Sequence, residues 1–388
     1  MNKVELIATS TFGLESVVAE EVKKLGYTDL QVENGKVSFQ ADLSAIPRTN
    51  LWLRTSDRVR VKIGEFRATT FDELFEQTKD LPWADWIPEN GTFPVEGKSV
   101  KSTLFSVSDC QAIVKKAVVE SLKKKYKTEW FEEKGPMYKI EVALLKDVAT
   151  LTIDTSGPGL HKRGYRELIG TAPLKETMAA ALILLSRWNP DRVLVDPFCG
   201  SGTIPIEAAL IGQNIAPGMN REFVSESWPI IPKTLWREAR AETHDLADYD
   251  RKLEIIGTDI DEEVLKIARR NAMEAGVEES IHFQRMAMKE LSSKRKYGYL
   301  ITNPPYGERL SDWKGAARLN KELGQVCSKL DTWSFYVITS DEQFEEHFGR
   351  TASKKRKLFN GNLKVDYYQF FGPKPPRPKQ TEETKLAD

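Results

Sequence analysis

The sequence predicts an α/β protein in which a smaller α+β part is followed by a parallel sheet covered by helices. From about residue 156 to 373, short apolar runs alternate with helical patterns, which is typical of a parallel sheet built from β-α units. The first 66 residues instead show the order β-α-β-β-α-β. At 388 residues the chain is long for a single core, so two or three domains are expected.

Composition and charge indicate a soluble globular protein, with 40% hydrophobic and 29% charged residues. The 57 basic and 57 acidic residues cancel, so a nucleic-acid partner would need local basic patches. Cys110, Cys199 and Cys327 lack the spacing of a disulfide framework or a zinc site, which predicts no metal and a reducing cytoplasm. The longest apolar stretch, 178–185, is too short for a membrane span, so no membrane partner is expected. Nothing in the sequence fixes an oligomeric state.

The first 66 residues predict a ferredoxin-like domain. The dipeptide Asn34-Gly35 between two β-type runs is a strong hairpin signal, and Gly26 marks the end of the first helix. The order β-α-β-β-α-β is ferredoxin-like, a fold that hosts many functions. The expected elements are a strand at 4–8, a helix at 13–25, the hairpin, a helix at 43–54 and a strand at 59–66.

Residues 67–155 contain a long helix, 109–126, for which Ser108 is the expected N-cap. One face of this helix is rich in lysine, and two more lysines lie just upstream. A solvated helix face is one interpretation. Because few acids interrupt the lysines, a surface for RNA phosphates is the other. The RNA-binding candidates are Lys98, Lys101, Lys115, Lys116, Lys123 and Lys124. The order of a strand, the crossover "KSTLFSVSD" and a basic helix resembles a THUMP domain, a module that binds RNA.

Three motifs follow predicted strands of the C-terminal part. "RVLVDPFCGSGT" is a strand ending in Asp196, then a glycine turn, then a helix beginning at Thr203. "EIIGTDI" ends in Asp259, and an acid there can bind both hydroxyls of a ribose, although residues 259–263 also suit a helix cap. "TNPPYGERL" places Asn303 to Tyr306 after a third strand. Pro205 stands where a nicotinamide-binding loop needs glycine, and no P-loop is present.

Together these motifs resemble the class I methyltransferases that use S-adenosylmethionine and act on exocyclic amines. Such an amine is a poor nucleophile because its lone pair is delocalised into the ring. The amide oxygen of Asn303 and the carbonyl of Pro304 can each accept one N–H and turn the lone pair toward the methyl group, while Tyr306 stacks on the base. Pro304 and Pro305 hold the acceptors in place. The catalytic candidates are therefore Asn303, Pro304, Pro305 and Tyr306.

The resemblance extends to nearly the whole chain. "LHKRGYR" (160–166) and "APLKETMAAALI" (172–183) are similar to the lead-in of the THUMP-containing ribosomal RNA guanine-N2 methyltransferases of the large-subunit methyltransferase L type. This implies a ferredoxin-like domain at 1–66, a THUMP domain at 67–155 and a Rossmann-like methyltransferase domain at 156–373. It also implies S-adenosylmethionine as cofactor, S-adenosylhomocysteine as product and RNA as partner. The composition of 374–388, rich in proline and charge, separately predicts a disordered tail.

The same resemblance assigns roles to individual residues. Arg163 and Arg166 would contact RNA or cofactor, unless 161–166 is only a linker between domains. Cys199 lies in the cofactor loop, where a small residue suffices, so we give little weight to a nucleophilic role. The implied cofactor-binding residues are Asp196, Phe198, Cys199, Gly200, Ser201, Gly202, Thr203, Asp259, Ile260 and Asn303.

This sequence departs from the family pattern in three places. Ala287 stands where many members have an acid for the adenine amine, and Met286 or Met288 would pack on the adenine instead. The chain lacks the second methyltransferase that long members carry at the C-terminus, so only the amine activity is implied. Residues 214–252, rich in tryptophan and charge, are an apparent insertion, and we expect them to lie over the ligand.

The function expected from the sequence is methylation of guanine N2 in 23S rRNA. A separate RNA-reading part of about 150 residues suits a structured RNA from which one base is flipped into the active site. Three alternatives stay open: adenine N6, a guanine N2 in tRNA, and a catalytically silent RNA-binding or assembly protein.

Overall fold

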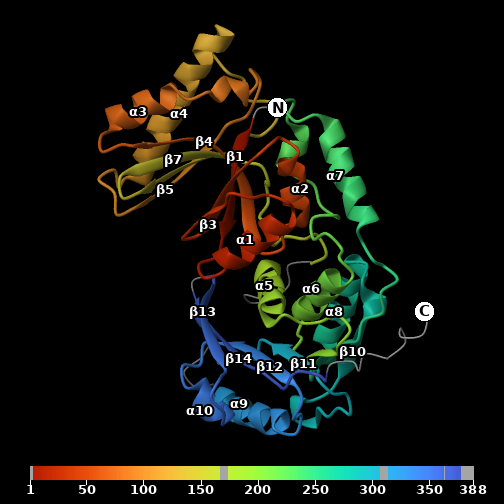
Figure 1. The fold of residues 1–388 in the computed structure, drawn as a ribbon. Coiled ribbons are helices and arrows are strands. Elements are labelled where there is room, and N and C mark those ends of the chain that lie inside the picture. Colours follow the sequence, from red (N-terminus) through yellow and green to blue (C-terminus); the bar gives the residue numbers. More distant parts are fainter. Residues whose placement is uncertain (1–2, 167–173, 306–312, 362, 377–388) are drawn as a thin grey trace, which may run out of the picture.

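A computed structural model describes residues 3–166, 174–305, 313–361 and 363–376 of the protein. Two seven-stranded sheets form the framework, one in the N-terminal part and one in the C-terminal part (Figure 1). Their strand orders are β2-β3-β1-β4-β7-β6-β5 and β10-β9-β8-β11-β12-β14-β13. Within the described residues, no helix has both the length and the hydropathy needed to cross a membrane.

The N-terminal sheet confirms the predicted β-α-β-β-α-β order. Its first half consists of β1 (Val4–Ser10), α1 (Glu15–Lys24), β2 (Gln31–Glu33), β3 (Lys36–Ala41), α2 (Ala45–Trp52) and β4 (Ser56–Arg67). Its second half consists of α3 (Phe71–Lys79), β5 (Val95–Val100), α4 (Val107–Tyr126), β6 (Ile140–Leu145) and β7 (Val148–Asp154). The long helix α4 begins before the predicted N-cap, because Ser108 already lies within it and Ser106 precedes it.

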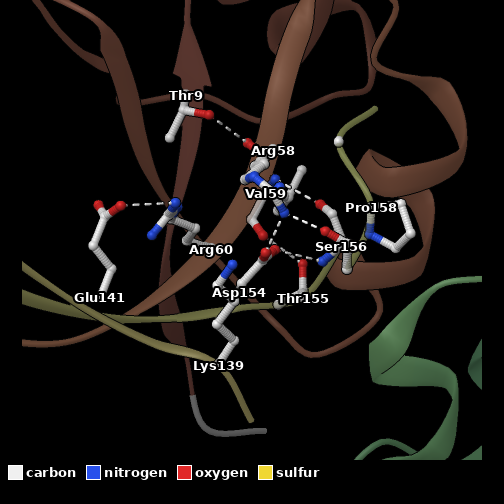
Figure 2. Close-up of polar contacts among 12 residues, drawn as sticks. Thr9, Arg58, Val59, Arg60, Lys139, Glu141, Asp154, Thr155, Ser156 and Pro158 are labelled. Carbon is white, nitrogen blue, oxygen red and sulfur yellow. Dashed lines mark hydrogen bonds and ion pairs between the residues drawn. The ribbon is translucent and has the colours of Figure 1, made fainter. Parts of the chain in front are cut away.

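The two halves share one sheet because β4 pairs with β7. Polar side chains reinforce this join where β7 ends (Figure 2). The Val59 N–H donates to Ser156 Oγ at 2.9 Å, and Arg58 forms an ion pair with the buried Asp154. Next to them, Arg60 pairs with Glu141 of β6 at 3.0 Å. The ferredoxin-like and THUMP-like parts therefore form one continuous body, which we call the N-terminal module (residues 3–155).

The C-terminal sheet confirms the predicted parallel arrangement of a Rossmann-like domain. Strands β10, β9, β8, β11 and β12 are parallel, whereas β14 pairs antiparallel with β12 and with β13. Helices α5, α6 and α8 cover one face, and α9 and α10 cover the other (Figure 1). The helices are α5 (Glu176–Ser186), α6 (Thr203–Gly212), α7 (Lys233–Asp245), α8 (Glu262–Glu274), α9 (Trp313–Cys327) and α10 (Phe344–Phe348). The strands are β8 (Leu194–Asp196), β9 (Ile255–Asp259), β10 (Ile281–Arg285), β11 (Tyr299–Thr302), β12 (Ser334–Thr339), β13 (Lys354–Asn360) and β14 (Leu363–Phe370).

The expectation that residues 214–252 lie over the ligand is wrong, because this insertion packs against the N-terminal module. Its helix α7 runs beside α2 (Figure 1). Trp228 is 1% exposed, stacks on Tyr138 with ring centroids 4.6 Å apart, and donates from Nε1 to the Met137 carbonyl at 2.8 Å. Burying tryptophan faces in a neighbouring core gives a strong driving force for this docking.

Packing between the two parts is reciprocal. Leu14, which caps the start of α1, and Val17 of α1 belong to the hydrophobic core of the catalytic domain, together with residues of α5 and α6. The insertion contributes Phe223, Trp228 and Trp236 to the core of the N-terminal module. Each part thus completes the core of the other, and we expect the two to behave as one rigid unit.

Replacing Trp228 tests this arrangement. Trp228→Ala should lower the free energy of unfolding by about 3–5 kcal/mol, since it removes a fully buried aromatic ring at the junction of the two parts. Urea denaturation measures the change. Trp130→Ala is the matched control, because Trp130 is 80% exposed and should change stability little. Equal losses for the two variants would contradict the proposed role of the insertion.

Candidate active site

A glycine turn connects β8 to α6 at the carboxyl edge of the catalytic sheet. Gly200 and Gly202 both have positive φ angles, 51° and 85°. A Cβ at Gly202 would also lie 3.1 Å from the Phe283 ring, so this position requires glycine for two reasons. The turn brings backbone N–H groups and the amino end of α6 to the edge, where a Rossmann-like domain binds its ligand.

Asp259 ends β9 next to this turn. Its Oδ2 accepts the Gly200 N–H at 3.1 Å, and its Oδ1 accepts the Asp261 N–H at 3.0 Å. A carboxylate has about four acceptor positions, so each oxygen can still accept a hydroxyl of a ribose. Ile260 is 67% exposed beside it and offers an apolar surface to a base. These residues fit the adenosine part of S-adenosylmethionine.

The ends of β8 and β11 are joined by a buried hydrogen bond. Thr302 Oγ1 donates to Asp196 Oδ1 at 2.5 Å, and the Phe198 N–H donates to the same oxygen at 3.1 Å. Burial raises the pKa of Asp196 to about 7, and the nearby Asp259 adds to the shift. A bound ammonium or sulfonium group would favour the ionised form. Because Thr302 precedes Asn303, this bond places the Asn-Pro-Pro segment next to the glycine turn.

Residues 303–305 leave β11 at the same edge of the sheet. Since β8, β9 and β11 are parallel neighbours, the three predicted motifs meet there. Tyr306, the fourth residue of the predicted catalytic set, lies outside the described residues. The sequence interpretation missed Thr302, although it directly precedes the motif.

Two side chains hold the cofactor loop through Ser201. Asn271 of α8 donates to the Ser201 carbonyl at 3.0 Å, and Arg166 donates to Ser201 Oγ at 3.3 Å. Arg166 also pairs with Glu176 at 3.1 Å and is largely buried. Arg166 therefore lies against the cofactor loop, and its predicted contact with cofactor or RNA stays a prediction. No local pattern marks Asn271, because its partner is 70 residues away in the sequence.

The prediction that Arg163 contacts RNA is wrong, because its guanidinium is buried. Arg163 Nε pairs with Glu207 at 3.3 Å, and Nη1 donates to the Leu160 carbonyl at 2.7 Å. Tyr165 donates to the same Glu207 carboxylate at 3.1 Å. Burial disfavours the charged form of Arg163, but the Glu207 carboxylate outweighs it and the pKa is raised. This segment anchors α6, in keeping with the linker interpretation.

Other expectations for this edge concern cysteine, methionine and the helix cap. Burial raises the pKa of the Cys199 thiol far above its usual range, which disfavours a nucleophilic thiolate. Met288 is buried in the core beside α9, and Met286 is partly buried against the same core. The predicted cap of α8 is confirmed, since Asp261 Oδ1 accepts the Glu263 N–H at 2.9 Å.

Several lysines of the predicted RNA-binding surface of the N-terminal module pair with acids. Lys115 pairs with Glu133 at 2.6 Å, and Lys123 pairs with Glu129 at 3.1 Å. A cleft of about 510 Å³ between α3 and α4 gathers lysines beside Glu120 and Glu129. Of the remaining candidates, Lys98 pairs with Glu141, and Lys124 lies 4.0 Å from Asp80. Lys116 lies over the Phe75 ring, and Lys101 is exposed in a turn. Apart from Glu120, which lies in α4 itself, these acids come from other segments, so the helix sequence did not reveal them.

The fold and the site together define a class I methyltransferase. Residues 163–369 match the family described as the RMKL-like methyltransferase domain, residues 5–60 match the RlmL ferredoxin-like domain, and residues 68–154 match the THUMP domain. The chain belongs to this RMKL-like methyltransferase family, and S-adenosylmethionine is its cofactor.

Similar proteins cover the full length of the chain. "Putative RNA methyltransferase YpsC" of Bacillus subtilis is 57% identical over 98% of this chain and 100% of its own. A Listeria monocytogenes structure described as a "predicted N6-adenine-specific DNA methylase" is 57% identical, has a TM-score of 0.92, and is matched over 96% of this chain and 97% of its own. The structure of SMU.472, "a putative methyltransferase complexed with SAH", is 47% identical with a TM-score of 0.92, over 97% and 100% of the chains.

Asp259 offers a direct test of cofactor binding. Asp259→Asn should weaken S-adenosylmethionine binding by one charge-assisted hydrogen bond, about 1.5–3 kcal/mol, or roughly tenfold to 150-fold in Kd. The introduced NH₂ would also oppose the Gly200 N–H. Calorimetry gives the affinity, and Glu279→Gln, at an exposed position, controls for the change in charge. Unchanged affinity in a folded Asp259→Asn variant would remove Asp259 from the site.

Asp196 should make stability depend on pH. Its pKa in the folded chain, about 7, lies above the ordinary value of about 3.9 in an unfolded chain. The stability contributed by the protonated group is therefore fully present below about pH 4 and is lost as pH rises through about 7. Asp196→Asn stays neutral, so its free energy of unfolding should fall less over this range.

Urea denaturation without cofactor between pH 4 and 8 measures the Asp196 effect. Asp250→Asn, at an exposed position, should follow the wild-type curve. A difference between wild type and Asp196→Asn that stays constant with pH would show that Asp196 does not titrate in this range.

Proposed function

We propose that this protein transfers a methyl group from S-adenosylmethionine to the exocyclic N2 amine of a guanine in RNA, specifically in 23S rRNA. The observation that carries this proposal is the position of residues 303–305. They follow β11 directly and are tied through Thr302 to Asp196, beside the glycine turn and Asp259. Two hydrogen-bond acceptors for an amine thus stand next to the site that fits the cofactor.

The chain contributes binding and orientation to this reaction. When bound, S-adenosylmethionine supplies an electrophilic methyl group on a sulfonium. Asp259 holds the ribose, and the glycine turn with Asp196 holds the methionine part. The Asn303 side-chain oxygen and the Pro304 carbonyl accept the two N–H bonds of the target amine, which directs the nitrogen lone pair toward the methyl group. Tyr306 provides a stacking surface for the base.

RNA as the substrate is supported by the THUMP match and by the name of the Bacillus subtilis relative. A module for RNA ahead of the catalytic domain suits an enzyme that binds a folded RNA and flips out one base. We further propose that domain boundaries lie near residues 66 and 155. Three free, buried cysteines fit a reducing cytoplasm.

Methylation of adenine N6 is the second candidate. The name of the Listeria monocytogenes structure favours it, and the Asn-Pro-Pro acceptors would serve either amine. The N-terminal module supports RNA over DNA for both candidates. A guanine N2 in tRNA and a silent assembly protein are the remaining alternatives, and they are separated from the proposal by the following experiment.

The experiment uses RNA from a strain that lacks the protein. Separated 23S, 16S and transfer RNA are each incubated with the purified full-length protein and with S-adenosylmethionine that carries a deuterated methyl group. The nucleosides of each RNA are then analysed by mass spectrometry. We expect labelled N2-methylguanosine in 23S RNA. Asn303→Ala should lower the rate at least 10²-fold with a nearly normal Kd for S-adenosylmethionine, because its acceptor serves the target amine.

Gln325→Ala, at an exposed position on α9, is the control for loss of an amide and should keep full activity. Label in N6-methyladenosine alone would replace guanine N2 with adenine N6 as the target. Label confined to transfer RNA would exclude ribosomal RNA. RNA binding without any label would show a silent protein.

A further inference from the structure

The hairpin formed by β13 and β14 extends beyond the carboxyl edge of the catalytic sheet. β12 ends at Thr339, which lies opposite Asp366 of β14. Residues 363–365 of β14 and 358–360 of β13 continue past this point. β12 is the neighbour of β11, from which the Asn-Pro-Pro segment emerges. With about 4.8 Å between strands, the outer strand β13 is roughly 14 Å from β11 across the sheet.

This hairpin is the most basic strand pair of the catalytic sheet. Residues 354–366 contain five basic side chains and one acid, in a chain with no formal net charge. Lys355 pairs with Asp366 at 3.3 Å, and Lys364 pairs with Glu342 at 3.0 Å. In the part of the chain that the structure describes, Lys354 and Lys357 have no carboxylate within 4 Å. On α4, by comparison, Lys115, Lys123 and Lys124 each have a carboxylate within 4.0 Å.

Aromatic rings lie beside these cations. Lys357 Nζ is 5.6 Å from the centroid of the Phe359 ring. Phe359 meets Phe12 edge to face at 5.9 Å, and Phe12, in the loop between β1 and α1, is 51% exposed. A lysine without a carboxylate partner near an exposed aromatic ring, here Phe12, is the combination that binds single-stranded nucleic acid through phosphates and stacked bases.

The β13–β14 hairpin, which carries these lysines, is held in place by contacts with the N-terminal module. Arg356 donates to the Gly13 carbonyl at 2.8 Å. Gly13 has a φ of 91°, and a Cβ there would lie 2.9 Å from the Lys357 carbonyl. Leu358 is fully buried in the catalytic core. The cations and rings are therefore positioned before any ligand arrives, which lowers the entropy cost of binding.

We propose that the β13–β14 hairpin, with Phe12, binds the single-stranded RNA next to the target nucleotide. Lys357, which lies level with the end of β12, contacts a phosphate, and Phe12 stacks on a base. The proposal rests on the proposed function, because a site that takes a flipped base needs the flanking strand held at the same edge of the sheet. It assigns part of RNA binding to the catalytic domain, in addition to the N-terminal module.

The test compares full-length wild type with Lys357→Ala and Phe12→Ala, using fluorescence anisotropy of a labelled single-stranded RNA of about 20 nucleotides. Lys357→Ala should flatten the log–log salt dependence of affinity by about 0.7, the value for one phosphate contact on a single strand. Phe12→Ala should weaken binding by about fivefold to a hundredfold, the effect of one lost base stack. Both variants should raise KM for RNA and keep the Kd for S-adenosylmethionine and the wild-type Tm.

Lys329→Ala is the matched control. This exposed lysine lies in the loop between α9 and β12, at the end of the catalytic sheet where the parallel strand β12 begins, away from the carboxyl edge that carries the three motifs. It should bind RNA like wild type. The proposal would be overturned if Lys357→Ala and Phe12→Ala both kept the wild-type RNA affinity, salt dependence and KM, even if the enzyme methylates RNA normally. RNA binding that falls in the variants, without methylation by any of the proteins, would support the hairpin and overturn the proposed function. A wild-type chain with no salt-dependent RNA affinity would point to an acidic protein partner and overturn the hairpin proposal.

Discussion

The buried ion pair between Arg163 and Glu207 is the interaction on which the arrangement of the two parts depends. Glu207 is fully buried in α6, the helix that begins at the cofactor loop, and Arg163 reaches it from the segment that leaves the N-terminal module. Arg163 also donates to the Arg54 carbonyl, just after α2. Removing one partner would leave an unpaired buried charge, at a cost of about 3–5 kcal/mol. The pair therefore fixes the N-terminal module to the helix that carries the cofactor loop.

Packing around this pair explains why the chain has one shape rather than two domains on a flexible tether. The insertion places tryptophans in the N-terminal core, and α1 places Leu14 and Val17 in the catalytic core. β4 and β7 make the N-terminal module a single sheet. The distance from the N-terminal module to the Asn-Pro-Pro segment is thus set by buried contacts, which suits the proposed selection of one base in a folded RNA.

Charge is distributed differently in the two parts. On α4, Lys115 pairs with Glu133, and Lys123 pairs with Glu129 and with Glu120 of the same helix, so these two lysines add less positive charge than the sequence indicates. On the edge strand β13 the basic residues exceed the acids around them. Since phosphates are attracted by net local charge, the arrangement of acids decides which basic segment can bind RNA.

The sequence by itself determined the order of strands and helices and the residues at the catalytic edge. Asp196, the glycine turn, Asp259 and the Asn-Pro-Pro segment could be predicted because each follows its own strand, and parallel strands bring their carboxyl ends to one edge. Only the tertiary structure decided the environment of side chains whose partners are distant in sequence. Arg163 is 44 residues from Glu207, and the indole of Trp228 is 91 residues from the Met137 carbonyl. A local pattern records the type and spacing of residues, whereas burial and ion pairing depend on which segments the fold brings together.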